Sequence, residues 1–427
     1  MNEEENEVRG ILAPLREPQA GPSGPCSADV ARAIAQGRRT IRRRRLAGAG
    51  GVAGVTALAV VALPVIAGAW REAPAGGTGV ATPSITRPPA VSPGDRRPGG
   101  VPAQCTAARL PVPDGVNRSI VTGVDPTGRF VLGRSYPGGS SHQVLIWDNG
   151  TPKRIAVPGA DQALNDANSA GVAIGSSFQS DKMVPWVYKD GKVTRLHGVQ
   201  WGAPIAIGET GRIVGYRGAS VSVAEQTPVV WSSPEAEAVD LPLPGNGWRG
   251  SVSSVGPDGT VVGTVTPPGA GAEGDRAKGY LWAPDGSVRM LPVPTIDGVP
   301  AAGFSASVID GDWVVGYAAR YMPQEKVFEH IAMRLNLRTN EWAPYPVVVP
   351  YNFTAVSINN RGWMAGLTGF HDHERPAVVS DAGLRHLPEY RGLTKQRATG
   401  ISDDGRVIAG QGDDSGNRVQ ALIWRCR

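Results

Sequence analysis

Residues 253–294 read SSVGPDGTVVGTVTPPGAGAEGDRAKGYLWAPDGSVRMLPVP, and this stretch decides the fold. Two short apolar segments flank a turn that ends in Gly259, and the second of them ends in Gly263. A third segment ends in Trp282 before an Asp-Gly turn, and the fourth contains Leu-Pro. Asp and Gly accept the positive φ that tight hairpins require. The stretch therefore predicts four short antiparallel strands joined by turns.

The same pattern recurs along the chain. The glycine that ends the second strand returns every 40 to 53 residues. Its seven positions are Gly133, Gly175, Gly215, Gly263, Gly316, Gly366 and Gly410. Blades of a β-propeller hold four strands in about 40 to 50 residues. The sequence thus predicts an all-β domain, a seven-bladed β-propeller of four-stranded antiparallel blades, over residues 105–427.

The last repeat ends after its third strand, and the start of the domain offers the missing fourth one. Residues 108–113, ARLPVP, closely match residues 289–294, RMLPVP, and precede the first repeat. Cys105 lies just before this segment, and Cys426 follows the last strand. We therefore expect the two ends of the domain to share one blade, which hides an open sheet edge, and the two cysteines to form a disulfide bond. Two unrelated free thiols are the alternative.

The repeat resembles the HAF repeats of exported bacterial proteins and is WD40-like in length. The resemblance rests on an Asn/Asp-x-x-Gly-x-Val-Val-Gly strand, a strand that ends in Leu-Trp and a following Leu-Pro, over about 320 residues. The His-Ala-Phe triplet of those repeats is absent: one matching place holds His142-Gln143-Val144. The resemblance implies a propeller fold and export, and it implies no particular activity.

An apolar segment precedes the repeats. Residues 46–70 carry no charge and are long enough to cross a bilayer as a helix. Six arginines lie between Arg38 and Arg45, and such a cluster keeps its end of a span in the cytoplasm. We therefore expect a single-pass protein of the cell membrane with an extracellular C-terminal domain.

The expected organisation is a cytoplasmic tail (1–45), a transmembrane helix (46–70), a linker rich in Pro and Gly (71–104) and the propeller (105–427). A cleaved signal peptide is the alternative, because residues 67–69 read Ala-Gly-Ala. The long segment ahead of the span favours an uncleaved signal-anchor.

Charge and motifs exclude several functions. The formal net charge of +5 comes largely from the Arg-rich tail, so the predicted propeller is nearly neutral and no nucleic-acid partner is expected. No Gly-x-Ser-x-Gly elbow and no nucleotide-binding P-loop occurs in the sequence. We expect no cofactor.

Candidate site residues fall in predicted loops. Aromatic side chains that can stack on sugars or peptides are Trp201, Trp248, Tyr321 and Tyr351, with packing inside the domain as the alternative. The one dense group of potential metal ligands is His371, His373 and Glu374, with a solvated loop as the alternative. These features favour a binding or scaffolding module for a protein, a peptide or an envelope polymer. A cell-envelope hydrolase or lyase with its site in the propeller funnel is the alternative function, and signalling through the Arg-rich tail is a third.

Overall fold

The computed structural model describes residues 100–136, 143–218, 226–270, 276–322, 327–344, 353–369 and 374–427. The predicted tail, transmembrane segment and most of the linker therefore lie outside the described residues. So do Tyr351, His371 and His373. Within the described ranges, no helix has the length and apolar character needed to cross a membrane.

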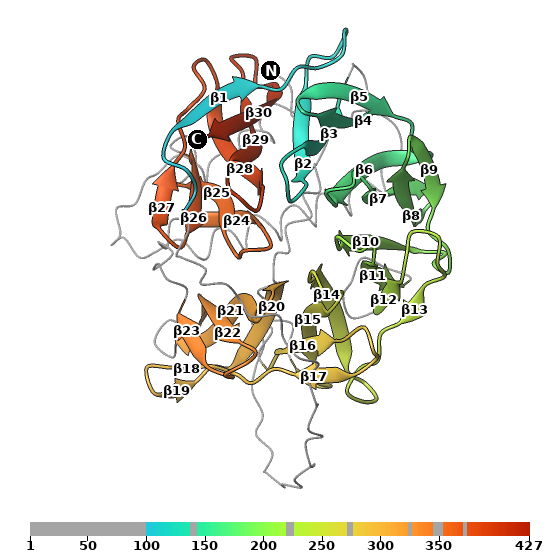
Figure 1. Cartoon of the computed structure of the whole chain (residues 1–427), viewed down its shortest axis with the longest axis vertical. Coiled ribbons are helices and arrows are strands. Elements are labelled where there is room, and N and C mark those ends of the chain that lie inside the picture. Colours follow the sequence, from blue (N-terminus) through green and yellow to red (C-terminus); the bar gives the residue numbers. More distant parts are fainter. Residues whose placement is uncertain are drawn as a thin grey trace, which may run out of the picture. The chain divides into compact units, whose positions relative to one another are not determined.

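The described residues form a β-propeller (Figure 1). Seven four-stranded antiparallel sheets, the blades, are arranged around a ring, with the first strand of each blade innermost. This confirms the predicted all-β fold and the seven repeats. The four strands of blades 1 to 6 follow one another in the sequence, and blade 7 combines strands from both ends of the domain.

The first three blades run in sequence order. Blade 1 consists of β2 (Ser119–Val124), β3 (Phe130–Ser135), β4 (Gln143–Asp148) and β5 (Thr151–Ile155). Blade 2 consists of β6 (Ala160–Ala167), β7 (Ala173–Gln179), β8 (Lys182–Lys189) and β9 (Lys192–Arg195). Blade 3 consists of β10 (Gly202–Ile207), β11 (Ile213–Arg217), β12 (Thr227–Trp231) and β13 (Val239–Asp240).

The remaining blades complete the ring. Blade 4 consists of β14 (Arg249–Val255), β15 (Val261–Thr266), β16 (Lys278–Trp282) and β17 (Val288–Met290), and the hairpin of β18 (Thr295–Ile296) and β19 (Val299–Pro300) follows it. Blade 5 consists of β20 (Gly303–Asp310), β21 (Trp313–Met322), β22 (Val327–Asn336) and β23 (Trp342–Pro344). Blade 6 consists of β24 (Phe353–Ile358), β25 (Met364–Thr368), β26 (Arg375–Ser380) and β27 (Gly383–His386). Blade 7 consists of β28 (Thr394–Ile401), β29 (Val407–Asp413), β30 (Val419–Cys426) and β1 (Cys105–Arg109).

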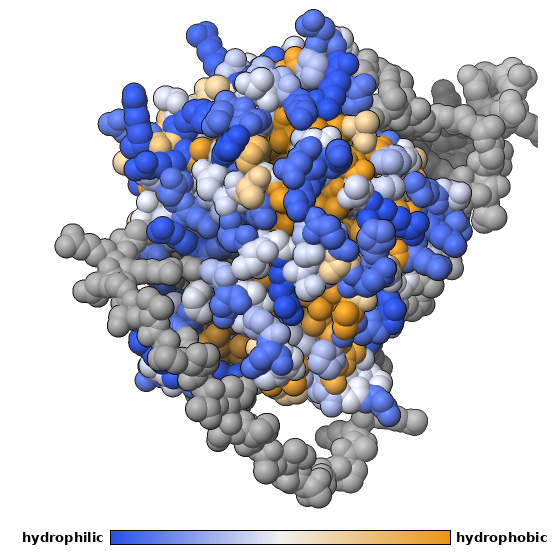
Figure 2. Space-filling view, turned by 45° about the vertical axis from the view of Figure 1, so that its right-hand side comes forward, coloured by the Kyte–Doolittle hydropathy of each residue, from blue (hydrophilic) through white to orange (hydrophobic). Residues whose placement is uncertain are grey.

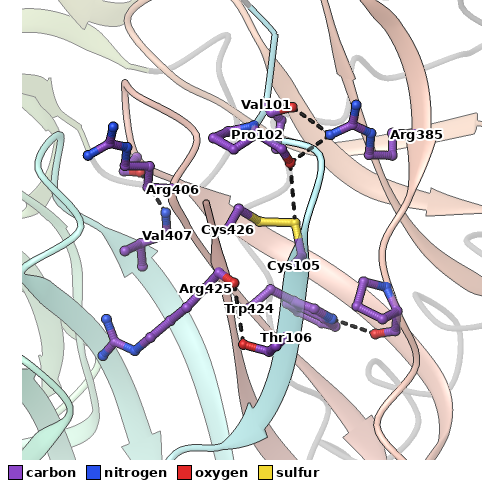
Figure 3. Close-up of a disulfide and its surroundings, with 12 residues drawn as sticks. Val101, Pro102, Cys105, Thr106, Arg385, Arg406, Val407, Trp424, Arg425 and Cys426 are labelled. Atoms are coloured by element: carbon purple, nitrogen blue, oxygen red, sulfur yellow. Dashed lines mark hydrogen bonds between the residues drawn. A yellow bond between two sulfur atoms is a disulfide. The ribbon is translucent and has the colours of Figure 1, made fainter.

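Strand β1 closes the ring, as predicted. It pairs antiparallel with β30 in a register that places Cys105 opposite Cys426, and the two cysteines form a disulfide bond (Figure 3). The borrowed strand starts earlier than the predicted 108–113 segment. It ends at Arg109, directly before Leu110-Pro111. The equivalent strand of blade 4, β17, likewise ends directly before its Leu-Pro pair.

A bulge in the first strand explains the repeated glycine. In blade 4 the pairing of β14 with β15 shifts just after Val252, which lies opposite Gly263. A Cβ atom on Gly263 would lie within 3.0 Å of the carbonyl oxygen of Ser251. All seven repeated glycines lie opposite such a shift: Gly133, Gly175, Gly215, Gly263, Gly316, Gly366 and Gly410. The bulge therefore requires a residue without a side chain.

The repeated tryptophan joins neighbouring blades. In blade 4 the indole Nε1 of Trp282 donates a hydrogen bond to the carbonyl of Pro242 in the chain that leaves blade 3, at 2.7 Å. Three other junctions have the same bond, from Trp147 to Pro111, from Trp231 to His197 and from Trp424 to Pro388. In blades 5 and 6, Leu335 and Val379 hold the equivalent register position and make no such bond.

The ring has two faces, defined by its connections. The upper face carries the connections from the second to the third strand and from one blade to the next. The lower face carries the turns from the first to the second strand and from the third to the fourth. First-to-second turns of neighbouring blades touch there, since the Asn359 side chain donates to the carbonyl of Ser402 at 2.9 Å.

The chain enters the propeller at the lower face. Arg385 of β27 donates hydrogen bonds to the carbonyls of Val101 and Pro102, at 2.5 and 2.6 Å (Figure 3). Val101 is buried against Trp363 and Cys426. The segment before β1 is thus bound to blade 6 beside the disulfide, on the face of the ring opposite to the upper face.

Candidate binding site on the upper face

A depression of about 470 Å³ opens on the upper face at blade 3. It lies between the connection that leads into β10 and the facing ends of β11 and β12. Its lining consists of Gly198, Gln200, Trp201, Arg217, Gly218 and Thr227. One aromatic and three polar side chains thus surround a space of the size that small-molecule sites commonly have, about 300 to 1,000 Å³.

Two glycines place Trp201 at this depression. A Cβ atom on Gly202 would overlap with the carbonyl oxygen of Tyr216, so only glycine lets the chain approach β11 so closely. Gly198 has φ of +80°, in the left-handed region that favours glycine. The carbonyl of Trp201 then accepts a hydrogen bond from the amide of Gly218, at 3.0 Å. The indole is therefore held beside the end of β11, where Arg217 lies.

The charges at the depression balance each other. The guanidinium of Arg217 forms a hydrogen-bonded ion pair with the carboxylate of Asp240, and both side chains are about half exposed. The other lining residues are uncharged. The described residues at the depression therefore offer donors and acceptors without a net charge.

The indole Nε1 of Trp201 makes no hydrogen bond to any residue in the described ranges. Six other tryptophans donate Nε1 to a neighbouring group: Trp147, Trp186, Trp231, Trp282, Trp363 and Trp424. The buried Nε1 of Trp342 shares with Trp201 the lack of a partner among the described residues. Trp201 is half-buried and lines the depression.

The other aromatic candidates have different surroundings. Trp248, just before β14, packs against the apolar cluster between blades 3 and 4, so the packing alternative holds for it. Tyr321 is 38% exposed at the end of β21, and its ring lies 5.2 Å from that of Phe328. Trp201, Trp248 and Tyr321 all lie at the upper face, on three consecutive blades. Tyr351 lies outside the described residues.

The predicted metal ligands are only partly described. Glu374 lines a second depression of about 280 Å³ on the upper face, together with Glu389 and Lys395. Glu389 accepts a hydrogen bond from Arg375 at 3.1 Å. His371 and His373 lie outside the described residues. Among the residues that are described, no group of three or more His, Cys, Asp or Glu side chains is arranged to hold a metal ion.

The carboxylates of the inner strands are engaged in the fold. Asp161 pairs with Arg134 of blade 1 at 2.6 Å. Asp166 accepts hydrogen bonds from the backbone amides of Ala167 and Ile207, both at 2.9 Å. Burial raises the pKa of Asp166 to about 7, against the effect of these two amides. Both carboxylates therefore connect neighbouring blades.

Exposed apolar side chains are scattered over the described surface. Figure 2 shows several separate apolar areas among hydrophilic residues on the face turned toward the viewer. The large exposed apolar residues are Val239, Val288, Met290, Val299 and Tyr321. Single exposed apolar residues are normal on soluble domains and do not by themselves mark an interface.

Sequence reasoning found one residue of the blade 3 depression and missed the rest. Trp201 stood out as an aromatic residue in a predicted loop. Gln200, Arg217 and Thr227 lie in different segments that only the pairing of β10, β11 and β12 brings together. The glycine on each side of Gln200 and Trp201 was the local signal for a special backbone.

No family model and no curated protein matches the chain. Among solved structures, the β-propeller domain of the Trilobed protease from Pyrococcus furiosus matches with a TM-score of 0.51 and 10% identity, over 72% of this chain and 96% of that chain. TolB from Acinetobacter baumannii matches with a TM-score of 0.38 and 12% identity, over 74% and 69%. An oligogalacturonate lyase in complex with manganese matches with a TM-score of 0.47 and 13% identity, over 75% and 93%.

These similarities concern the fold. At such low identity a shared propeller fold carries no information on activity, since one fold hosts many functions. The protease propeller is described as having an open velcro topology. The present ring is closed by β1 and by the bond between Cys105 and Cys426. The described part of the chain is therefore an all-β, seven-bladed propeller whose first and last strands are covalently joined.

Proposed function

We propose that this chain is a membrane-anchored, extracytoplasmic protein of the HAF-repeat type that binds an envelope polymer, a peptide or a protein through the upper face of its propeller. The apolar segment 46–70 and the arginines before it support the anchor. The disulfide bond supports an oxidising compartment.

The observation that carries this proposal is the open depression at Trp201. It combines a half-buried indole, whose Nε1 has no partner among the described residues, with three polar side chains on the upper face. The linker joins the propeller on the lower face, through Val101 and Pro102. The proposed anchor would therefore be attached on the face opposite to the depression.

A hydrolase or lyase is the second candidate, and Asp166 is the observation that favours it. A carboxyl group with a pKa of about 7 suits general acid catalysis near neutral pH. However, its carboxylate accepts hydrogen bonds from the amide of Ala167 in blade 2 and from the amide of Ile207 in blade 3. The carboxylate thereby connects the two blades. A structural role explains this residue, so we favour binding.

Sedimentation with an isolated, insoluble bacterial envelope polymer tests the proposal. We expect the full-length chain, purified in detergent, to sediment with the polymer and to release no soluble fragments. Substitution of Gln200 and Arg217 by alanine weakens this binding on the order of tenfold, because both line the upper-face depression. Arg129→Ala is the matched control, since it removes an exposed ion pair with Asp148 near a lower-face turn. Equal losses in both variants, or release of fragments, would count against the proposal.

The membrane anchor has its own test. Alkaline extraction of membranes is expected to leave the full-length chain in the pellet, and a variant that lacks residues 46–70 is expected to be extracted. Loss of the N-terminal segment from the mature chain would instead support a cleaved signal peptide.

A further inference from the structure

We propose that the depression at Trp201 is a subsite for a neutral saccharide unit. The inference rests on the proposed binding function and names the ligand chemistry at the same face.

The aromatic plane is the first element of the subsite. A half-buried indole supplies a large rigid surface that loses little conformational freedom on binding, and its Nε1 is a donor. Sugar rings present faces of C–H groups that pack on such a plane, and hydroxyl groups that accept from such a donor. The backbone at Trp201 is held in place by the bond from Gly218 and by the close approach at Gly202.

The polar groups are the second element. Hydroxyl groups of a sugar both donate and accept hydrogen bonds. Arg217 contributes planar donors, and the Gln200 amide and Thr227 hydroxyl contribute both donors and acceptors. The ion pair holds the guanidinium in place, which lowers the entropic cost of binding.

Charge balance sets the class of saccharide. Because Asp240 neutralises Arg217, an anionic sugar would gain a favourable partner only by breaking this ion pair. A neutral sugar binds beside it without that loss. The second depression, at Glu374, has four charged side chains and no aromatic residue in its lining, so it lacks the plane that a sugar ring needs.

Titration calorimetry of the full-length chain tests the inference. The probes are neutral tetrasaccharides of N-acetylglucosamine, glucose and mannose, a tetrasaccharide of galacturonic acid, and a proline-rich peptide. We expect at least one neutral tetrasaccharide to bind more tightly than the acidic one and the peptide.

Variants locate the subsite. Trp201→Ala is expected to weaken binding of the neutral sugar on the order of tenfold or more, comparable to the loss of one stacking contact. Trp201→Phe retains a ring without the Nε1 donor and is expected to fall between wild type and Trp201→Ala. Arg129→Ala, near a lower-face turn, is the control and is expected to bind like wild type. Thermal melting confirms that each variant is folded.

The inference is wrong if no neutral tetrasaccharide binds, if the acidic sugar or the peptide binds more tightly, or if folded Trp201→Ala binds like wild type. These failures are distinguishable from failure of the proposed function. A chain that still sediments with the envelope polymer through its upper face keeps the binding function without this subsite. A chain that sediments with no polymer loses both.

Discussion

The repeated glycines and the acids of the inner strands show how single residues shape the ring. Each repeated glycine faces a carbonyl of the bulged first strand, and this neighbour belongs to its own blade. The periodic sequence located these residues correctly, but it did not reveal the bulge that requires them.

The bulge predicts the effect of a single methyl group. Gly263→Ala would place a Cβ atom within 3.0 Å of the Ser251 carbonyl, so the strands must separate or the bulge must rearrange. We expect the free energy of unfolding to fall by about 3 kcal/mol, or the protein not to accumulate. Gly245→Ala is the control, because its nearest neighbour would lie at 3.5 Å and its φ is not positive. Chemical denaturation measures both, and equal stabilities would contradict the role of the bulge.

Asp166 predicts a dependence of stability on pH. Its pKa of about 7 in the folded protein lies above the value of about 3.9 in an unfolded chain. Between about pH 4 and pH 7 the folded state therefore holds a proton that the unfolded state has lost. Linkage then requires that this residue's contribution to stability falls as pH rises through this range and stays constant above it.

Asp166→Asn isolates that contribution. The variant cannot titrate at this position, so its stability relative to wild type is expected to increase by about 2–4 kcal/mol from pH 4 to pH 7. Denaturant titrations at several pH values measure the difference. Asp404→Asn, at an exposed lower-face turn, is the control. A constant difference between Asp166→Asn and wild type would show that the carboxyl is ionised throughout.

Neighbouring blades are held together by different contacts at different junctions of the ring. Four carry the bond from a tryptophan Nε1 to a carbonyl of the preceding blade's outer chain. Blades 5 and 6 have no such bond. Their contacts include Tyr317 with Met364, at 3.5 Å, and Arg334 with Asp381, at 3.6 Å. Apolar side chains around Val315 and Met364 also pack at this junction.

The tryptophan bond predicts a local loss of stability. Trp282→Phe keeps a large ring in the core and leaves the Pro242 carbonyl without its donor. We expect a loss of about 1–3 kcal/mol in the free energy of unfolding. Trp201→Phe, at a residue whose Nε1 has no partner in the described structure, is expected to change stability little. Denaturation under one set of conditions compares the free energies of unfolding of the two variants. Equal losses would contradict a role of the Trp282 hydrogen bond in joining blades 3 and 4.

The strands and their order could be predicted from the sequence because the repeat has a clear period. The residues of the binding site could be predicted only in part. The turn glycines, the terminal tryptophans and the Leu-Pro segments each mark a fixed place in a blade. The binding site depends on residues such as Arg217 and Thr227, which resemble ordinary strand residues in the sequence. Their meeting with Trp201 follows from strand pairing, which the local pattern does not encode.

At the scale of the whole molecule, the ring is closed by contacts between the two ends of the propeller domain. Cys105 and Cys426 are separated by 321 residues, and β1 also pairs with β30 along its length. Sequence alone predicted this closure, since two cysteines flank the copied strand and the truncated last repeat. The strand pairing and the bonds from Arg385 hold the same segment independently of the disulfide.

Removal of the disulfide is therefore expected to weaken the ring without opening it under native conditions. For Cys105→Ser with Cys426→Ser, we expect a loss of stability of up to about 5 kcal/mol in the chain-entropy model. Wild type treated with reductant is the control and should show the same loss. Denaturation measures the loss, and a variant as stable as oxidised wild type would show that the bond does not constrain the unfolded chain.

The most direct test of the account is hydrogen exchange of the full-length chain with and without the envelope polymer to which it binds. We predict slower exchange at residues 198–202 and 217–218 of the upper face. The lower-face turns at 125–128 and 402–405 should exchange at unchanged rates. Protection confined to the lower-face turns, or absent from residues 198–202, would contradict binding through the upper face.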